Sequence, residues 1–354
     1  MKNIPAVRIE AINTLMRDAK PYRLQQIEKA LFSSDITCWD NITTLPKKIR
    51  ERLTINIPFF SCKEGEIISS REKDAFKAVL NLLDDCGIET VLMKNARNNW
   101  TVCLSTQAGC SMGCIFCATG SMGLIRNLNI DEIIDQYRFW VKFMKQKKIA
   151  GNITNLVFMG MGEPFLNYEN TRDAIRLLLK HSSIGKTRIT ISTIGIIAKL
   201  EEILKDKFWP DVRIAISLQS ANYNTRKRLI PKTSNHFYQE LDEWARKYFK
   251  KYSSRRNYLT VEYIMLKNIN DTDDELKKLI KLAKRIGKVK VNLIPYNSTK
   301  DEFQKSDFKT ILKFKSSLEE NDITATIRES KGQDIKAACG QLIAENKQGN
   351  ISPE

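Results

Sequence analysis

The stretch QAGCSMGCIFCATGSMG, residues 107–123, places Cys110, Cys114 and Cys117 within eight residues and follows them with glycines and other small residues. It comes directly after a β-rich run, WTVCLS, at residues 100–105. Further β-rich runs follow, each with a helical pattern behind it: TNLVFMG, TRITIST, VRIAISL, LTVEYIML and VKVNLIP. Repeated strand–helix units predict an α/β fold with a parallel sheet, either open or curled into a partial barrel. Ligands bind at the carboxyl ends of the strands in such sheets, so the cysteine loop is expected there.

The remaining sequence indicates smaller units around this core. YRLQQIEKALF carries its apolar residues on one helical face, and PKKIRERL begins a second helix at Pro46. AFKAVLNLLDD and IETVLMK, on either side of a turn, favour a hairpin. The expected organisation is a helical, RNA-binding N-terminal domain (1–62), a β-rich connecting extension (63–99), the strand–helix core with a C-terminal cysteine segment (100–346) and a loose tail (347–354).

Charge and composition narrow the functional class. The chain of 354 residues has a formal net charge of +17, which indicates a polyanionic partner such as nucleic acid, although lysines on solvated helix faces would give the same count. Its basic segments are spread along the chain, at 47–53, 226–232, 246–256 and 281–290. We find no leader pattern and no apolar run near the ~20 residues that a membrane helix needs, and therefore expect a cytoplasmic protein with reduced thiols.

The three clustered cysteines then indicate a metal site. Structural zinc usually needs four ligands, but the chain has no second Cys-x2-Cys pair and only two histidines, His181 and His236. Cys-x3-Cys-x2-Cys on one loop can instead ligate three irons of a [4Fe–4S] cubane cluster. The fourth iron has no protein ligand in that arrangement, so a small molecule is expected to bind it.

The same residues resemble a known family. Cys-x3-Cys-x2-Cys with Phe116 before the last cysteine is similar to the signature of radical S-adenosylmethionine (SAM) enzymes, and GMGEP, residues 160–164, resembles their motif for the SAM amino group. More narrowly, the chain resembles the RlmN/Cfr family of RNA adenosine methyltransferases, through CLSTQAGCSMGCIFCATG, FMGMGEPFLN, ISTIGII, VNLIPYN and DIKAACGQL. The resemblance covers residues from about 20 to 345. It implies a partial (β/α)6 radical SAM barrel, a [4Fe–4S] cluster, and SAM used twice per turnover.

The resemblance also implies the residues that hold the cofactors. Cys110, Cys114 and Cys117 would ligate the cluster. In GMGEP, Gly160 and Gly162 would let the backbone approach the ligand, and Glu163 can accept hydrogen bonds from an ammonium group. The family usually has His at the position of Gln219 in this chain. A SAM contact made by the backbone at this position would therefore be kept, whereas one made by the His side chain would not. The further SAM contacts implied by resemblance are Ser192, Ser217, Leu218, Gln219 and Asn297.

Two further cysteines carry the chemistry that the resemblance implies. Cys339 takes a methyl group from one SAM, and a radical from a second SAM removes hydrogen from this S-methyl group. The resulting methylene radical adds to the adenine ring, and Cys103 releases the adduct by attack on the Cys339 sulfur, which leaves a disulfide to be reduced. Glu89 matches the family's proton acceptor. No role is assigned to Cys38, Cys62 or Cys86, for which core packing is the default.

The implied substrate is an adenosine of 23S rRNA, with tRNA as a second substrate in some relatives. GEP and IPYN resemble the C2 methylases, whereas STIGII and EKALF resemble the C8 branch, and we favour C2. We expect a monomer that takes electrons from flavodoxin or ferredoxin. The alternatives are a radical SAM enzyme of another class, which would not need Cys339, and a non-enzymatic iron–sulfur or zinc RNA-binding protein, which would need neither GMGEP nor STIGII.

Overall fold

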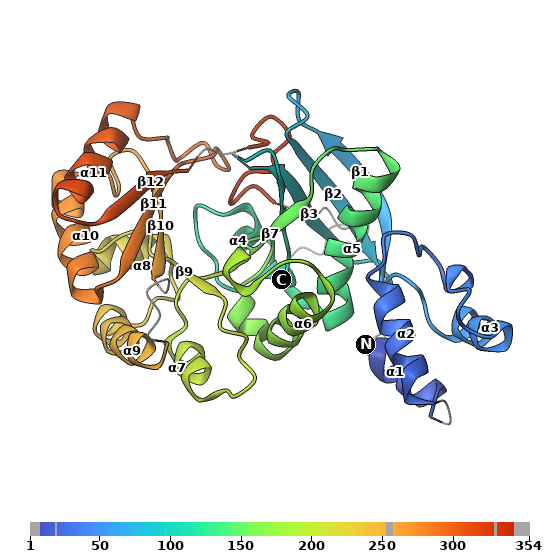
Figure 1. Cartoon of the computed structure of the whole chain (residues 1–354). Helices are drawn as coiled ribbons and strands as arrows, with labels where there is room; N and C mark the ends of the chain where they lie inside the picture. Colours follow the sequence, from blue (N-terminus) through green and yellow to red (C-terminus); the bar gives the residue numbers. More distant parts are fainter. Residues whose placement is uncertain (1–7, 18–19, 96, 253–257, 329–330, 343–354) are drawn as a thin grey trace, which may run out of the picture.

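One open ten-stranded sheet organises the protein (Figure 1). The computed structural model describes residues 8–17, 20–95, 97–252, 258–328 and 331–342. The strand order in the sheet is β1-β2-β3-β4-β7-β8-β9-β10-β11-β12. These strands are β1 (Cys62–Ser69), β2 (Ala75–Leu82), β3 (Gly87–Lys94), β4 (Trp100–Cys103), β7 (Ile153–Phe158), β8 (Ile189–Thr193), β9 (Arg213–Ser217), β10 (Leu259–Met265), β11 (Val289–Pro295) and β12 (Thr324–Ile327).

The second half of the sheet is parallel from β4 to β12. The six strand runs predicted from Trp100 onward are β4, β7, β8, β9, β10 and β11, and β12 adds a seventh parallel strand. The connections between them contain α5 (Ile130–Gln146), α6 (Tyr168–His181), α7 (Ile197–Lys205), α8 (Tyr223–Leu229), α9 (Phe237–Lys251), α10 (Asp273–Ile286) and α11 (Phe308–Glu320). The predicted α/β fold with a partial barrel is confirmed, since the parallel strands and their helices are present and the sheet does not close.

The segment expected as a β-rich extension contains β1, β2 and β3, which pair antiparallel with one another. β3 also pairs antiparallel with β4, so this segment continues the core sheet. The sequence did not predict β1, which lies at the sheet edge and whose residues are all exposed or partly buried. The domain boundaries at residues 62 and 99 stay predictions, and the tail at 347–354 lies outside the described residues.

A small second sheet carries the cysteine loop. It pairs β5 (Gln107–Cys110) with β6 (Gly123–Asn127), and α4 (Ala118–Ser121) lies between them. A Cβ atom at Gly109 would lie 2.0 Å from the carbonyl oxygen of Gly123, so only glycine allows this pairing. The short 3₁₀ helices are η1 (Trp39–Asn41), η2 (Pro164–Asn167) and η3 (Lys186–Arg188).

The N-terminal helices form a cluster with its own apolar core. They are α1 (Arg8–Leu15), α2 (Pro21–Leu31) and α3 (Lys47–Asn56), of which α2 and α3 match the two helices that the sequence predicted. Ile12, Ile27, Trp39 and Leu53 are buried together between them. Across the described ranges, no helix has the length and apolar character that crossing a membrane requires.

A buried ion cluster joins these helices to α5. The carboxylate of Asp135 pairs with the guanidinium groups of Arg8 and Arg138, and it accepts hydrogen bonds from the backbone N–H and the hydroxyl of Ser61 at 2.6 and 2.8 Å. Burial opposes ionisation of this carboxyl, but the two guanidinium charges lower its pKa to about 2. Asp135 therefore remains charged at neutral pH and fixes the N-terminal helices to the core.

We expect Asp135→Asn to lower the free energy of unfolding by about 3–5 kcal/mol, because it removes the carboxylate that pairs directly with two buried guanidinium groups. Asp35→Asn is the matched control, since Asp35 pairs with Lys145 at the exposed surface, where an ion pair contributes about 0–1 kcal/mol. Urea unfolding of both variants provides the measurement. Equal losses in the two variants would show that Asp135 does not fix the N-terminal helices.

Candidate active site

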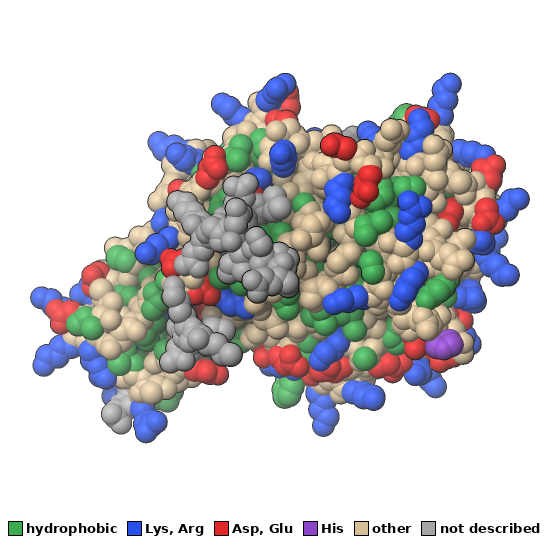
Figure 2. Space-filling model, turned by 180° about the vertical axis from the view of Figure 1, so that it is seen from behind, with side chains coloured by type: hydrophobic (Ala, Val, Ile, Leu, Met, Phe, Trp, Pro, Cys, Tyr) green, Lys and Arg blue, Asp and Glu red, His purple; other side chains and the backbone are tan. Residues whose placement is uncertain are grey.

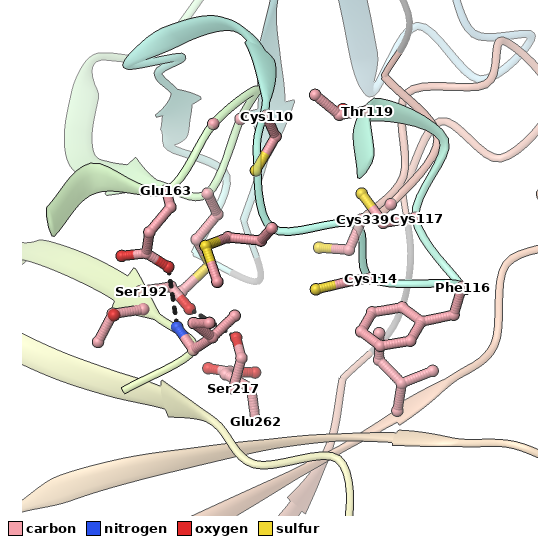
Figure 3. A pocket seen from close by; sticks show the side chains of 18 of the residues that line it. Cys110, Cys114, Phe116, Cys117, Thr119, Glu163, Ser192, Ser217, Glu262 and Cys339 are labelled. Atoms are coloured by element: carbon pink, nitrogen blue, oxygen red, sulfur yellow. Dashed lines mark hydrogen bonds between the residues drawn. The ribbon is translucent and has the colours of Figure 1, made fainter. Parts of the chain in front are cut away.

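A cavity lies at the carboxyl ends of the parallel strands, beneath the cysteine loop (Figure 3). Thiols lie on one side of it, and Glu163, Ser192 and Ser217 lie on the other. The predicted site residues that line this cavity are Cys110, Cys114, Cys117, Gly162, Glu163, Ser192, Ser217, Gln219 and Cys339. The fold therefore collects side chains from β5, β8, β9 and the C-terminal segment at one place, as the parallel sheet predicts.

The three loop cysteines lie together in the lining of the cavity. All three line the cavity, but within the described part of the chain no three Cys, His, Asp or Glu side chains converge on a position for one metal ion. Cubane ligands bind three different irons and need not converge. Cys110 and Cys114 are buried among Met112 and Phe116, and burial raises the pKa of the Cys110 thiol to about 11. The thiol set and its apolar surroundings fit an iron–sulfur cluster.

Glu163 presents a fixed carboxylate to the cavity. Its Oε2 accepts a hydrogen bond from the Ile194 N–H at 2.9 Å, and its Oε1 accepts one from the Phe165 N–H at 3.1 Å. Burial raises its pKa to about 7, although both backbone donors favour the charged form. Bringing a cationic group against such a carboxylate restores the charged form, so the site suits an ammonium group.

The glycines of GMGEP are required by their neighbours in the protein. A Cβ atom at Gly160 would lie 2.6 Å from the Ser105 hydroxyl and 2.7 Å from the Leu104 carbonyl oxygen. Gly162 has a φ of +99°, and its Cβ would lie 2.5 Å from that of Gln107. The sequence interpretation assigned these glycines to ligand approach alone. The structure adds that they let this segment lie against residues 104–107, which lead into the cysteine loop.

The remaining predicted SAM contacts occupy different positions. The hydroxyl groups of Ser192 and Ser217 lie 3.1 Å apart on adjacent strands. Gln219 has a φ of +60°, and its side-chain oxygen accepts a hydrogen bond from the Ile264 N–H at 2.7 Å, so this side chain is already engaged within the protein. Leu218 is buried and does not line the cavity.

Asn297 also lies outside the lining and contacts the C-terminal segment instead. Its Nδ2 donates to the carbonyl oxygen of Cys339 at 3.3 Å, and its Oδ1 accepts from the Gln333 side chain at 2.8 Å. The structure therefore places Asn297 where it holds the Cys339 backbone.

Cys103 and Cys339 share a second, smaller cavity that adjoins the first. Both line it, and Cys339 also lines the first cavity. All eight cysteines are free thiols. Burial raises the pKa of the Cys103 thiol to about 12, whereas the nearby guanidinium of Arg328 favours its thiolate. Of the predicted catalytic residues, Cys339 is thus the one that shares a cavity with the cysteine loop and another with Cys103.

Glu89 is not brought into either cavity. It lies on β3, buried, and its carboxylate forms an ion pair with Lys77 at 2.9 Å. Its backbone carbonyl accepts a hydrogen bond from the Ser105 hydroxyl at 2.6 Å, so it lies beside the chain that leads from β4 to the cysteine loop.

Arg328 and Glu262, which are charged residues in the cavity lining, were not identified from the sequence. Arg328 follows β12, which was not predicted, and it lines both cavities. Glu262 lies within β10, 3.8 Å from the Arg328 guanidinium, and burial raises its pKa. A carboxylate in the middle of the apolar run LTVEYIML was the available signal for Glu262.

This fold and this site define a radical SAM protein, and the comparisons with known proteins agree. The family model described as "Radical SAM superfamily" matches residues 104–283. A "Ribosomal RNA large subunit methyltransferase N" of Nitrosopumilus maritimus is 36% identical over 91% of this chain and 92% of its own length. A "Probable dual-specificity RNA methyltransferase RlmN" of Thermotoga petrophila is 38% identical over 97% of both chains.

A solved structure is similar over the whole fold. The crystal structure of a radical SAM methyltransferase from Sphaerobacter thermophilus matches with a TM-score of 0.87 and 34% identity, over 96% of this chain and 98% of the other. The chain belongs to the RlmN family of radical SAM RNA methyltransferases. Its cofactors are accordingly a [4Fe–4S] cluster and SAM.

Proposed function

We propose that this enzyme methylates a ring carbon of an adenosine in 23S rRNA, with C2 favoured over C8 and with tRNA as a further substrate. The observation that carries the proposal is the position of Cys339, which lines one cavity with the cysteine loop and the other with Cys103. A thiol in that position can receive a methyl group beside the cofactors and then be reached by a second thiol. A radical SAM enzyme of another class has no need for this pair.

The cofactor-binding roles follow the cavity lining. Cys110, Cys114 and Cys117 would hold the cluster, and Glu163 would accept hydrogen bonds from the SAM ammonium group. Ser192, Ser217 and the backbone near Gln219 would flank the same ligand. When bound, the cluster supplies the electron that cleaves SAM to a 5′-deoxyadenosyl radical.

Cys339 would be the carrier of the methyl group. Its thiolate would attack the methyl carbon of one SAM and displace S-adenosylhomocysteine. The 5′-deoxyadenosyl radical from a second SAM would then take a hydrogen atom from that S-methyl group, and the resulting carbon radical would add to the adenine ring. Glu89 would accept the proton from the adduct, which requires its carboxylate to leave Lys77, and the unpaired electron of the adduct would return to the oxidised cluster. The Cys103 thiolate would then attack the Cys339 sulfur, and the released methylene group would take up a proton to become the methyl group of the base. A Cys103–Cys339 disulfide remains for reduction.

Mass spectrometry of target adenosines tests the proposed substrate and carbon. A host lacking its own C2 methylase, supplied with this chain, should gain methyladenosine in 23S rRNA, and chromatography against C2 and C8 standards assigns the position. The Cys339→Ala variant is the matched control. A wild-type chain that adds no methyl group to either 23S rRNA or tRNA would refute the proposal.

We propose that the basic surface of the protein contacts phosphate groups of the RNA backbone. Figure 2 shows Lys and Arg side chains around the rim and across one face rather than in a single patch. Of the four basic segments, 226–232 contributes less than its sequence indicated, because Arg226 is fully buried. In 246–256, Lys250 lies near the end of α9 and is exposed, while residues 253–256 lie outside the described ranges.

We expect Lys250→Glu to weaken RNA binding and to flatten its salt dependence, since one phosphate contact changes the slope of log affinity against log salt by about 1. Fluorescence anisotropy with a target hairpin across a salt series provides the measurement. Lys281→Glu, on the exposed face of α10, reports on a second basic segment under the same conditions. An unchanged slope in either variant removes that residue from the RNA-binding surface.

We further propose a monomeric enzyme that works in the cytoplasm and takes electrons from a flavodoxin or a ferredoxin. The proposed Cys103–Cys339 disulfide must be reduced in each turnover, which suits a reducing compartment. Sedimentation velocity tests the monomer, and reduction of the cluster by each purified carrier tests the donor.

A further inference from the structure

Arg226 is a fully buried cation in the wall between the cysteine loop and the strand ends. It lies on α8, directly after β9, with none of its surface exposed. Its guanidinium donates to the carbonyl oxygens of Ser217, at 2.9 Å, and of Leu218 and Ile194. It also stacks on the Phe237 ring, 3.8 Å from the centroid. One side chain thus connects the segments that follow β8 and β9.

The charge of Arg226 is not offset by a carboxylate. Among the described residues, its guanidinium hydrogen bonds go to carbonyl oxygens rather than to an Asp or Glu, and its Nε is buried without a hydrogen-bond partner. Burial lowers its pKa to about 10, which still leaves it protonated at neutral pH. The carbonyl oxygens that accept its hydrogen bonds carry no net charge, so a nearby negative group would further stabilise this buried cation.

The cysteine loop lies directly against this helix. The Ile115 N–H donates to the carbonyl oxygen of Leu229 at 3.1 Å, which connects the loop between Cys114 and Cys117 to the last turn of α8. Leu229 and Ile230 belong to the same buried apolar cluster as Cys110 and Cys114. Charges on the loop thiolates and on Arg226 therefore interact through a region of low dielectric constant.

We propose that Arg226 is a positioning residue whose buried positive charge offsets the negative charge of the thiolate-held cluster and thereby raises its reduction potential. This inference rests on the proposed function. A 2+ cubane held by three thiolates carries one net negative charge and two after reduction, so a nearby fixed cation favours the reduced form. The same guanidinium holds the carbonyl groups after β8 and β9, which places the strand ends that flank SAM.

Two substitutions separate charge from hydrogen bonding. Arg226→Gln removes the charge and keeps one donor, whereas Arg226→Lys keeps the charge and loses the planar fork. Arg226→Met repeats the neutral test with a flexible side chain that fills much of the same volume. Arg228→Gln is the matched control, because Arg228 lies on the same helix with its side chain exposed.

The test is a redox titration of the anaerobically purified protein, followed by electron paramagnetic resonance, with iron content measured for each variant. At a fixed potential, the ratio of reduced to oxidised cluster should fall about tenfold in Arg226→Gln, a shift of about 59 mV for one electron. Arg226→Lys and Arg228→Gln should stay within about threefold of the wild type. Equilibrium binding should show weaker SAM affinity in Arg226→Lys, since the carbonyl contacts are changed.

A wild-type midpoint in Arg226→Gln, or an equal fall in Arg226→Lys, would overturn the inference. If both neutral variants fail to take up iron while Arg226→Lys does so, the charge is required for cluster assembly, and the assignment of its role to the reduction potential is overturned. Loss of iron in all three variants would show that Arg226 is needed for the local structure of the site rather than for its charge, and would overturn the inference. A wild-type chain that binds no cluster would instead refute the proposed function.

Discussion

Cys103→Ala is expected to trap the enzyme as a covalent complex with its RNA. Methylation of Cys339, cleavage of SAM and addition to adenine use other groups, so these steps should proceed in the variant. The release step needs a second sulfur beside Cys339, and the small cavity that the two cysteines share provides Cys103 for it. Without that thiol the methylene bridge between Cys339 and the base persists, so each enzyme molecule should react only once.

Denaturing gel electrophoresis with labelled RNA measures the complex. Cys103→Ala/Cys339→Ala should form none, because the bridge has no sulfur to attach to, and Cys86→Ala should turn over like the wild type. If Cys103 serves only as a small buried side chain, its loss should cost about 1 kcal/mol of stability and leave chemistry intact. Wild-type turnover in Cys103→Ala, or a crosslink that survives in the double variant, would rule out the assigned pair.

The parallel core was predictable from its local sequence. Runs such as TRITIST and VRIAISL are continuously β-rich, and helical patterns separate them. Both features can be read from neighbouring residues in the sequence. β5 and β6 gave no such signal, since each is short and both contain glycine. Their pairing depends on the contact between Gly109 and Gly123, which a sequence pattern does not display.

The candidate site was predictable where a motif lies on one loop and less so where the fold brings distant groups together. The cysteine loop and GMGEP are local, and both line the cavity. Arg226 looked like part of a basic surface segment, yet the close approach of α8 to the strand ends buries it. The sequence alone favours a surface position for Glu89, but the pairing of β2 with β3 lets it meet Lys77 in the interior.

Cys110→Ala, Cys114→Ala and Cys117→Ala are each expected to abolish cluster and activity together. Three protein thiolates leave one iron of a cubane open for SAM, so loss of any one removes a ligand from a second iron and weakens the hold on the cluster. The wild type, purified without oxygen, should hold about four iron and four sulfide per chain, and each variant much less.

Iron and sulfide analysis, with absorbance near ~400 nm, is the direct measurement. Cys38→Ala is the control, because Cys38 is an exposed thiol in the N-terminal helical region and should leave iron content and methylation unchanged. Circular dichroism of the three loop variants separates loss of the cluster from loss of the fold. Stoichiometric zinc in the wild type without that absorbance, or methylation by any loop variant, would contradict the assignment of these thiols, because radical cleavage of SAM needs an electron that zinc cannot supply.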